Sequence, residues 1–223
     1  MSVFVYLLEV FGTAAFAASG SMLAIKKNMD IFGVCVMGLV TACAGGVIRD
    51  LFLGQLPPVM FLEPIYAAVA IAVSFVMFLP SVRRLLAAKE RAYERILLLT
   101  DAAGLGIFTG AGVLAVVRAG YGGNFFFAAF LGVMTGVGGG ILRDVLAGLP
   151  PYIFVKHIYA IASIAGAVIC TVLVRYMNDS SAMMICCIVV FVIRILAAYY
   201  RWSLPKANLN QQWKENRESS PHS

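Results

Sequence analysis

The sequence contains the same polar motif twice, each time inside a strongly apolar stretch. Residues 41–58 read TACAGGVIRDLFLGQLPP, and residues 135–151 read TGVGGGILRDVLAGLPP. Each copy holds a glycine cluster, an Arg-Asp pair and a double proline in the same order. A duplicated polar motif inside apolar sequence is typical of a membrane protein whose two halves build one site between them.

The similarity between the two halves extends beyond this motif. The further aligned pairs are Glu9 and Asp101, Gly12 and Gly104, Phe16 and Phe108, Gly20 and Gly112, and Tyr66 and Tyr159. Each copy spans three apolar segments, and because three is odd, the second copy enters the membrane from the opposite side. The sequence therefore predicts an inverted repeat, related by a pseudo-two-fold axis in the membrane plane.

The composition places most of the chain in a membrane. Hydrophobic residues make up 61% of it and charged residues only 13%, about half the charged share of a typical soluble domain. We expect an all-α integral membrane protein with seven transmembrane helices, at 3–25, 31–54, 64–80, 96–117, 125–148, 157–176 and 181–200. Residues 1–92 form the first repeat, 93–177 the second and 178–203 the last helix; 204–223 form a polar cytoplasmic tail that we expect to be disordered.

The distribution of positive charge predicts the orientation. Twelve Lys and Arg residues fall in segments that this topology puts on one side, and two, Arg118 and Arg175, fall on the other. Positively charged segments stay in the cytoplasm, so we expect the N-terminus outside and the C-terminus inside. The net charge of +6 is thereby explained without a nucleic-acid partner.

Signatures of catalysis or of a resident ligand are not found in the sequence. It has no phosphate-binding loop, no HExxH, no GxSxG and no Cys/His cluster, and its five cysteines lie in apolar segments. We therefore expect a protein that is not an enzyme and that has no cofactor and no metal site.

The glycine clusters allow two interpretations. Gly45-Gly46 and Gly138-Gly139-Gly140 sit near the middle of the helices expected at 31–54 and 125–148. Glycine lowers helix stability by about 1 kcal/mol relative to alanine, so the clusters favour helices that are broken there and line a pathway. Close helix packing alone is the alternative, because small residues recur every fourth position.

The Arg-Asp pairs lie at or near membrane depth, where charges require partners or water. We predict that Arg49 pairs with Glu9 and that Arg143 pairs with Asp101, one pair in each half. The pairs constrict a pathway at its two ends, clamp the helix ends, or do both. The expected pathway residues are Thr41, Gly45, Gly46, Arg49, Asp50, Thr135, Gly138, Gly139, Gly140, Arg143 and Asp144.

Other polar residues in apolar surroundings keep two interpretations each. Tyr66 and Tyr159 belong to an interfacial aromatic belt or line the pathway. Lys156 and His157 contact lipid headgroups or only add to the cytoplasmic positive charge. Arg194 extends to the interface or joins a contact between subunits.

These features together resemble the trimeric intracellular cation (TRIC) channel family, in its bacterial branch. The resemblance covers about residues 3–205 and rests on the paired GG(G)xxRD motifs. It implies a homotrimer in the lipid of the bacterial inner membrane, with a pore in each subunit between the two broken helices. That pore passes monovalent cations, chiefly potassium. The resemblance maps the helix kinks to the two glycine clusters and the charges beside the pore to Arg49 and Arg143.

The chain departs from the family pattern in two places. Its first motif reads Ala44-Gly45-Gly46 in place of three glycines, and the Lys-Glu-Val signature of the animal members is absent. A secondary transporter is the competing hypothesis, because inverted repeats with broken helices also build alternating-access carriers. A small zwitterion such as glycine would then bind near Arg49 or Arg143.

Overall fold

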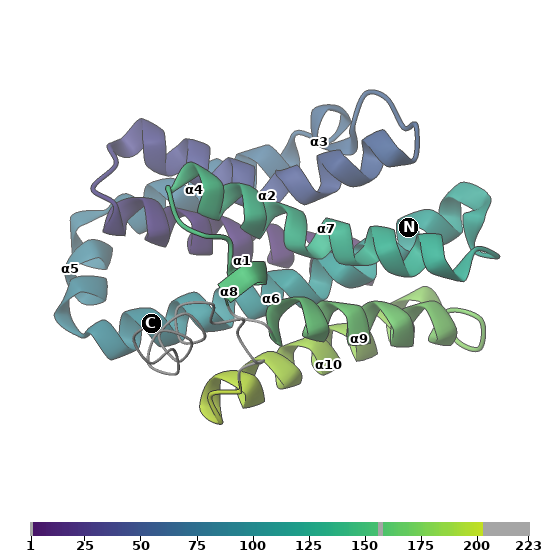
Figure 1. Ribbon diagram of the computed structural model, residues 1–223. Coiled ribbons are helices and arrows are strands. Elements are labelled where there is room, and N and C mark those ends of the chain that lie inside the picture. The colour runs from purple at the N-terminus through teal and green to yellow at the C-terminus, as the bar shows by residue number, and fades with distance from the viewer. Residues whose placement is uncertain (1, 156–157, 203–223) are drawn as a thin grey trace, which may run out of the picture.

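The computed structural model describes residues 2–155 and 158–202, and this part of the chain is helical throughout apart from short connections. Its long helices run roughly along one direction, and α5 turns across one end (Figure 1). The helices are α1 (Val3–Lys26), α2 (Ile31–Phe52), α3 (Val59–Leu62), α4 (Ile65–Phe78), α5 (Pro80–Ala88), α6 (Glu90–Val116), η1 (Val117–Tyr121), α7 (Phe125–Leu146), α8 (Tyr152–Val155), α9 (Ile158–Leu173) and α10 (Asp179–Tyr199). The π-helical turn η1 directly extends α6.

The boundaries of the long helices follow from their capping residues. Ser2, Asp30, Asn124 and Asn178 each accept a hydrogen bond from the backbone N–H three residues later, at the start of α1, α2, α7 and α10. The helices that carry the duplicated motif end in the same way. Gly54 and Gly148 both have φ of +67°, a conformation in which glycine is strongly preferred and which closes a helix. Residues 156–157 and 203–223 lie outside the described residues.

Within residues 2–155 and 158–202, five helices are long and apolar enough to cross a membrane: α1, α2, α6 with η1, α7 and α10. The span expected at 64–80 corresponds to α4; α5 follows it from Pro80, and the two together qualify as a sixth crossing but are bent by 67° relative to each other. The span expected at 157–176 corresponds to the 16-residue helix α9. The predicted all-helical, multi-pass architecture is confirmed at this level.

The helices pack as two groups of three. Helices α1, α2 and α4 contact one another, as do α6, α7 and α9, and the groups meet through α1 against α6 and α2 against α7. Helix α10 packs on α6 and α9, so it covers the second group. The grouping follows the two copies recognised in the sequence.

Equivalent residues of the two halves touch each other at the centre. The rings of Phe16 and Phe108 stack with centroids 5.4 Å apart. Gly12 lies against Phe108, and Gly104 lies against Phe16, so that each aromatic ring rests on the glycine of the other half. Reciprocal contacts of this kind are what a two-fold axis between the halves produces.

The glycine clusters lie where α2 and α7 cross, but they do not break either helix. Each helix is continuous through its cluster, so the predicted break at Gly45-Gly46 and at Gly138-Gly139-Gly140 is wrong for this structure. A Cβ on Gly45 would overlap the Thr135 carbonyl oxygen, and one on Gly139 would overlap the Thr41 carbonyl oxygen. The physical reason is close approach: without side chains, the two backbones lie in contact and both helices stay intact.

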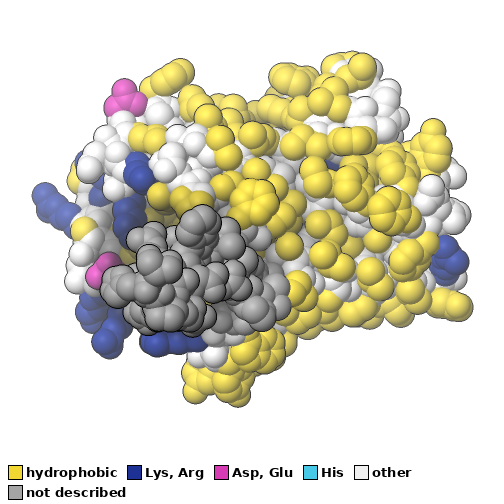
Figure 2. Space-filling view, in the orientation of Figure 1, with side chains coloured by type: hydrophobic (Ala, Val, Ile, Leu, Met, Phe, Trp, Pro, Cys, Tyr) yellow, Lys and Arg dark blue, Asp and Glu magenta, His cyan; other side chains and the backbone are white. Residues whose placement is uncertain are grey.

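Positive charge gathers at the end of the molecule where α5 lies, whereas hydrophobic side chains cover much of the rest of the face shown (Figure 2). Lys26, Lys27, Arg91, Arg95 and Arg201 all line one cavity at that end. They come from three segments that the sequence places on the cytoplasmic side, and the fold brings these segments together.

Candidate functional site: two charged clusters on either side of a helix crossing

The Arg-Asp pairs build the same local structure twice. Asp50 accepts a hydrogen bond from Arg49 Nε at 2.8 Å and another from the Val59 backbone N–H at 2.8 Å. Asp144 accepts from Arg143 Nε at 2.9 Å and from the Tyr152 backbone N–H at 2.8 Å. Each aspartate thus ties the end of its helix to the residue that follows the double proline. The pair acts as a clamp in both halves.

We expect Asp50→Ala to lower the thermal midpoint and to make the connection 53–64 sensitive to added protease. The substitution removes the acceptor of the Val59 N–H and the ion-pair partner of Arg49, and hydrogen bonds to charged groups contribute about 1.5–3 kcal/mol. The matched control is Asp30→Ala, which removes the exposed cap at the other end of α2. If both variants gave the same cleavage pattern, Asp50 would not be holding this connection.

The first cluster combines Glu9 from α1, Arg49 and Asp50 from α2, and Tyr66 from α4. The Tyr66 hydroxyl donates to Glu9 Oε2 at 3.0 Å. Arg49 makes its ion pair with Asp50, at 2.8 Å, and its side chain is 11% exposed. The predicted Glu9–Arg49 pair is therefore wrong as a direct contact: the neighbouring carboxylate of Asp50 takes the guanidinium, and a tyrosine takes Glu9.

The second cluster is more deeply buried and is centred on Arg143. Its Nη1 donates to Asp101 Oδ1 at 2.6 Å and to Ser19 Oγ at 2.6 Å, and its Nη2 lies 2.9 Å from Asp144 Oδ1. Arg143, Asp101 and Asp144 are each at most 1% exposed. The predicted Asp101–Arg143 pair is confirmed, and it joins α6 to α7 while Ser19 adds α1.

Arg194 from α10 also belongs to the second cluster, although the sequence offered no assignment for it there. Its Nη2 lies 3.8 Å from Asp101 Oδ2, and its guanidinium carbon lies 4.7 Å from the centroid of the Tyr159 ring. The signal in the sequence was the depth of an isolated arginine in an apolar helix, where a partner carboxylate is required. What the sequence could not supply was which carboxylate.

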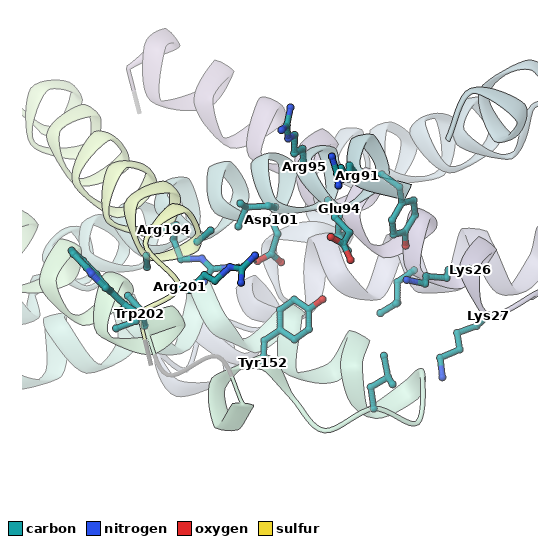
Figure 3. A pocket seen from close by; sticks show the side chains of 18 residues that line it. Lys26, Lys27, Arg91, Glu94, Arg95, Asp101, Tyr152, Arg194, Arg201 and Trp202 are labelled. Atoms are coloured by element: carbon teal, nitrogen blue, oxygen red, sulfur yellow. Dashed lines mark ion pairs between the residues drawn. The ribbon is translucent and has the colours of Figure 1, made fainter. Parts of the chain in front are cut away.

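Two cavities lie toward opposite ends of α1, one beside Leu23 and Lys26 and the other beside Glu9 and Thr13. The larger, about 870 Å³, opens at the basic end and reaches Asp101, Tyr152 and Arg194; Figure 3 shows Asp101 and Arg194 directed toward each other at its wall. The smaller, about 40 Å³, reaches Glu9, Gly46 and Arg49. Gly46, next to the contact of Gly45 with Thr135, lines the smaller cavity, whereas no residue of α2 or α7 lines the larger one.

The two threonines that were predicted to line the pathway use their hydroxyl groups for hydrogen bonds within their own helices. Thr41 donates its hydroxyl to the Met37 carbonyl, and Thr135 donates to the Leu131 carbonyl, both at 2.6 Å. Their backbone carbonyls are what the opposite glycines touch. Lys156 and His157, proposed to contact lipid, lie outside the described residues. Among residues 2–155 and 158–202, no group of His, Cys, Asp and Glu side chains could hold a metal ion.

The charges nearly balance within each cluster. The first holds two carboxylates and one guanidinium, and the second holds Asp101 and Asp144 against Arg143 and Arg194. Buried arginines that are matched in this way present little net positive charge to a passing ion. The arrangement therefore offers polar groups at both ends of the crossing without an excess of positive charge.

Comparison with known proteins agrees with this geometry. A family model described as "Glycine transporter" matches residues 6–81 and 98–175, which fall in the two halves. The inner membrane protein YadS of Escherichia coli K12 is 38% identical over 211 residues, covering 93% of this chain and 98% of its own. A crystal structure of a prokaryotic TRIC channel aligns with a TM-score of 0.83 at 29% identity, over 92% of this chain and all of that one.

The TRIC orthologue of Rhodobacter sphaeroides is similar to the same extent. It aligns with a TM-score of 0.81 at 31% identity, over 90% of this chain and all of its own. Sequence relatives and solved structures thus match along nearly the whole chain and along both halves. The chain belongs to the family of this model and of YadS, the bacterial branch of the TRIC channel family.

Proposed function

We propose that the protein is a membrane channel that passes monovalent cations, chiefly potassium, through a pathway within each subunit between α2 and α7. The observation that carries the proposal is a pair of cavities toward opposite ends of α1, each of which reaches one of the two charged clusters. Similarity to solved TRIC cation channels along the whole chain supports it. The proposal includes no enzymatic step.

In this proposal the closed point of the pathway is the contact between the two glycine clusters. Outward displacement of α2 or α7 would separate the contacts of Gly45 with Thr135 and of Gly139 with Thr41, where backbone meets backbone. The charged residues next to the contact are Arg49, Asp50, Arg143 and Asp144, with Glu9 and Asp101 as their charge partners. The carboxylates neutralise the arginines, so a cation is not repelled at either end.

We further propose the topology and assembly predicted from the sequence. All seven long helices cross the membrane, α4 and the 16-residue α9 included, with the halves inverted and the N-terminus outside. The basic end shared by Lys26, Arg91 and Arg201 would then face the cytoplasm of a bacterial inner membrane. The E. coli relative is described as an inner membrane protein. The functional unit would be a homotrimer.

Purified protein in a planar bilayer tests the function directly. We expect unitary currents in a potassium chloride gradient, with a reversal potential close to that of potassium. Thiol modification then tests the pathway, because Cys43 lines the smaller cavity beside Gly46. A small cationic methanethiosulfonate added on the outer side is expected to reduce the current of the wild-type protein several-fold.

The matched control for this experiment is Cys43→Ala, which should conduct normally and resist the reagent. The other cysteines, which lie apart from that cavity, remain in place in the control. A current through the wild-type protein that the reagent leaves unchanged would move the pathway away from α2. A bilayer without unitary currents would contradict the channel itself.

The second candidate is a carrier for a small zwitterion such as glycine. The second cluster favours it specifically: Asp101 Oδ2 is a buried acceptor without a hydrogen bond, and Arg194 Nε and the Tyr159 hydroxyl are buried donors without one. Such a set matches an ammonium and a carboxylate group. Saturable glycine uptake into proteoliposomes, without unitary currents, would identify the carrier.

A further inference from the structure

Arg194 is a buried cation that contacts only the second of the two charged clusters. It is the sole basic residue of α10, and it is 4% exposed. Because α10 packs on α6 and α9 and stands outside the duplicated halves, Arg194 adds a second guanidinium to the second cluster alone. In the first cluster the corresponding carboxylate, Glu9, is held by the Tyr66 hydroxyl.

Asp101 lies between two guanidinium groups and is bonded to one of them. Its Oδ1 accepts from Arg143 at 2.6 Å. Its Oδ2 faces Arg194 Nη2 at 3.8 Å, which is beyond hydrogen-bond distance. Both Asp101 Oδ2 and Arg194 Nε are buried without a hydrogen-bond partner, although buried polar groups are normally satisfied. An acceptor and a donor are therefore close to forming a bond that is not made in this arrangement.

The unmade contact lies where movement has room. Asp101 and Arg194 both line the cavity of about 870 Å³ at the basic end, and Figure 3 shows their side chains directed toward each other there. Arg143 is not among the residues that line this cavity. A small rotation of the Asp101 carboxylate would bring it to Arg194 and away from Arg143.

We propose that Arg194 is a positioning residue for opening the pathway: Asp101 transfers its ion pair from Arg143 to Arg194 when α7 moves. Separating Arg143 from Asp101 would otherwise leave a buried carboxylate without a partner, which is strongly unfavourable. Arg194 keeps Asp101 paired in the open arrangement. The difference in free energy between the closed arrangement, with Asp101 on Arg143, and the open one therefore becomes smaller. This inference rests on the proposed channel function.

The test is single-channel recording of the wild type, Arg194→Gln and Arg194→Lys, each checked for folding by gel filtration. Arg194→Gln is expected to lower the open probability about tenfold while the unitary conductance stays the same, because the closed pair Arg143–Asp101 loses its competitor. Arg194→Lys keeps the charge but not the planar fork, and its open probability should fall about threefold. The matched control is Arg84→Gln, an exposed arginine that lines neither cavity, which should change neither quantity.

Each result decides between gating and support of the fold. An unchanged open probability in a folded Arg194→Gln channel, with wild-type currents intact, would overturn the role of Arg194 and leave the channel function standing. The role of Arg194 would also be overturned if the open probability of the variants fell only in proportion to their loss of thermal stability. If Arg194→Gln does not fold, Arg194→Lys decides instead: a wild-type open probability in that variant would overturn the role of Arg194. A wild-type protein without currents would overturn both proposals.

Discussion

Replacing Gly45 with alanine is expected to lower the thermal midpoint of the detergent-solubilised protein by several degrees. The new methyl group would overlap the carbonyl oxygen of Thr135 and lie 3.1 Å from its carbonyl carbon. These are backbone atoms of α7, which cannot rotate aside as a side chain would, so the two helices must separate. Overpacking of this kind costs about 1–3 kcal/mol. Thermal unfolding monitored by intrinsic tryptophan fluorescence or by circular dichroism measures the change.

Gly46→Ala, one residue further along α2, is the matched control. The atom nearest to a Cβ at Gly46 is Arg49 Nη2, 3.9 Å away, so the methyl group fits without displacement. Both substitutions gain the same helix propensity, about 1 kcal/mol, and only Gly45→Ala also meets the backbone of α7. The reciprocal substitution Gly139→Ala should behave like Gly45→Ala, since it meets the Thr41 carbonyl. Equal midpoints for Gly45→Ala and Gly46→Ala would show that the helices do not touch at Gly45.

The second large effect is expected from Arg143→Met. Methionine fills a similar space but leaves Asp101 and Asp144 buried without their main cation. Removing one partner of a buried ion pair costs about 3–5 kcal/mol. We therefore expect a lower thermal midpoint and a smaller yield of folded protein. In the protein that does fold, unitary conductance or gating should change if the arginine borders the pathway.

Two further variants separate the causes of this effect. Arg49→Met removes a guanidinium that is partly exposed and has Asp50 as its ion-pair partner, and we expect it to cost clearly less than Arg143→Met. Adding Asp101→Asn to Arg143→Met removes one of the unpaired charges and should restore part of the lost stability. If Arg49→Met and Arg143→Met were equally destabilising, burial of the second cluster would not be the cause.

The sequence predicted those features that follow from duplication and from membrane depth. The two halves, the positions of the long helices and the Asp101–Arg143 pair came from aligned residues and from the need of a buried charge for a partner. The Glu9–Arg49 pair failed although it was argued in the same way. In the first half the Tyr66 hydroxyl bonds Glu9, and Arg49 pairs with Asp50 instead. Alignment of the two halves alone could not rank these partners.

The glycine clusters show a different limit of sequence reasoning. Consecutive glycines permit either a broken helix or a close approach of two backbones, and composition cannot choose between them. The choice depends on which atoms of the other helix lie opposite, here the carbonyl groups of Thr41 and Thr135. The place of Arg194 was equally hidden, because α10 lies outside the repeat and no aligned position indicated its neighbour.

The stacking of Phe16 on Phe108 bears on how such a protein arises. These rings are copies of one ancestral position, and a position meets its own copy only across a two-fold axis. If the halves are inverted as proposed, the three-helix ancestor had to insert into the bilayer in both directions to form this contact as a dimer of separate chains. In that history a gene fusion fixes one copy in each direction, so that a change at either phenylalanine alters a surface that two identical molecules once shared.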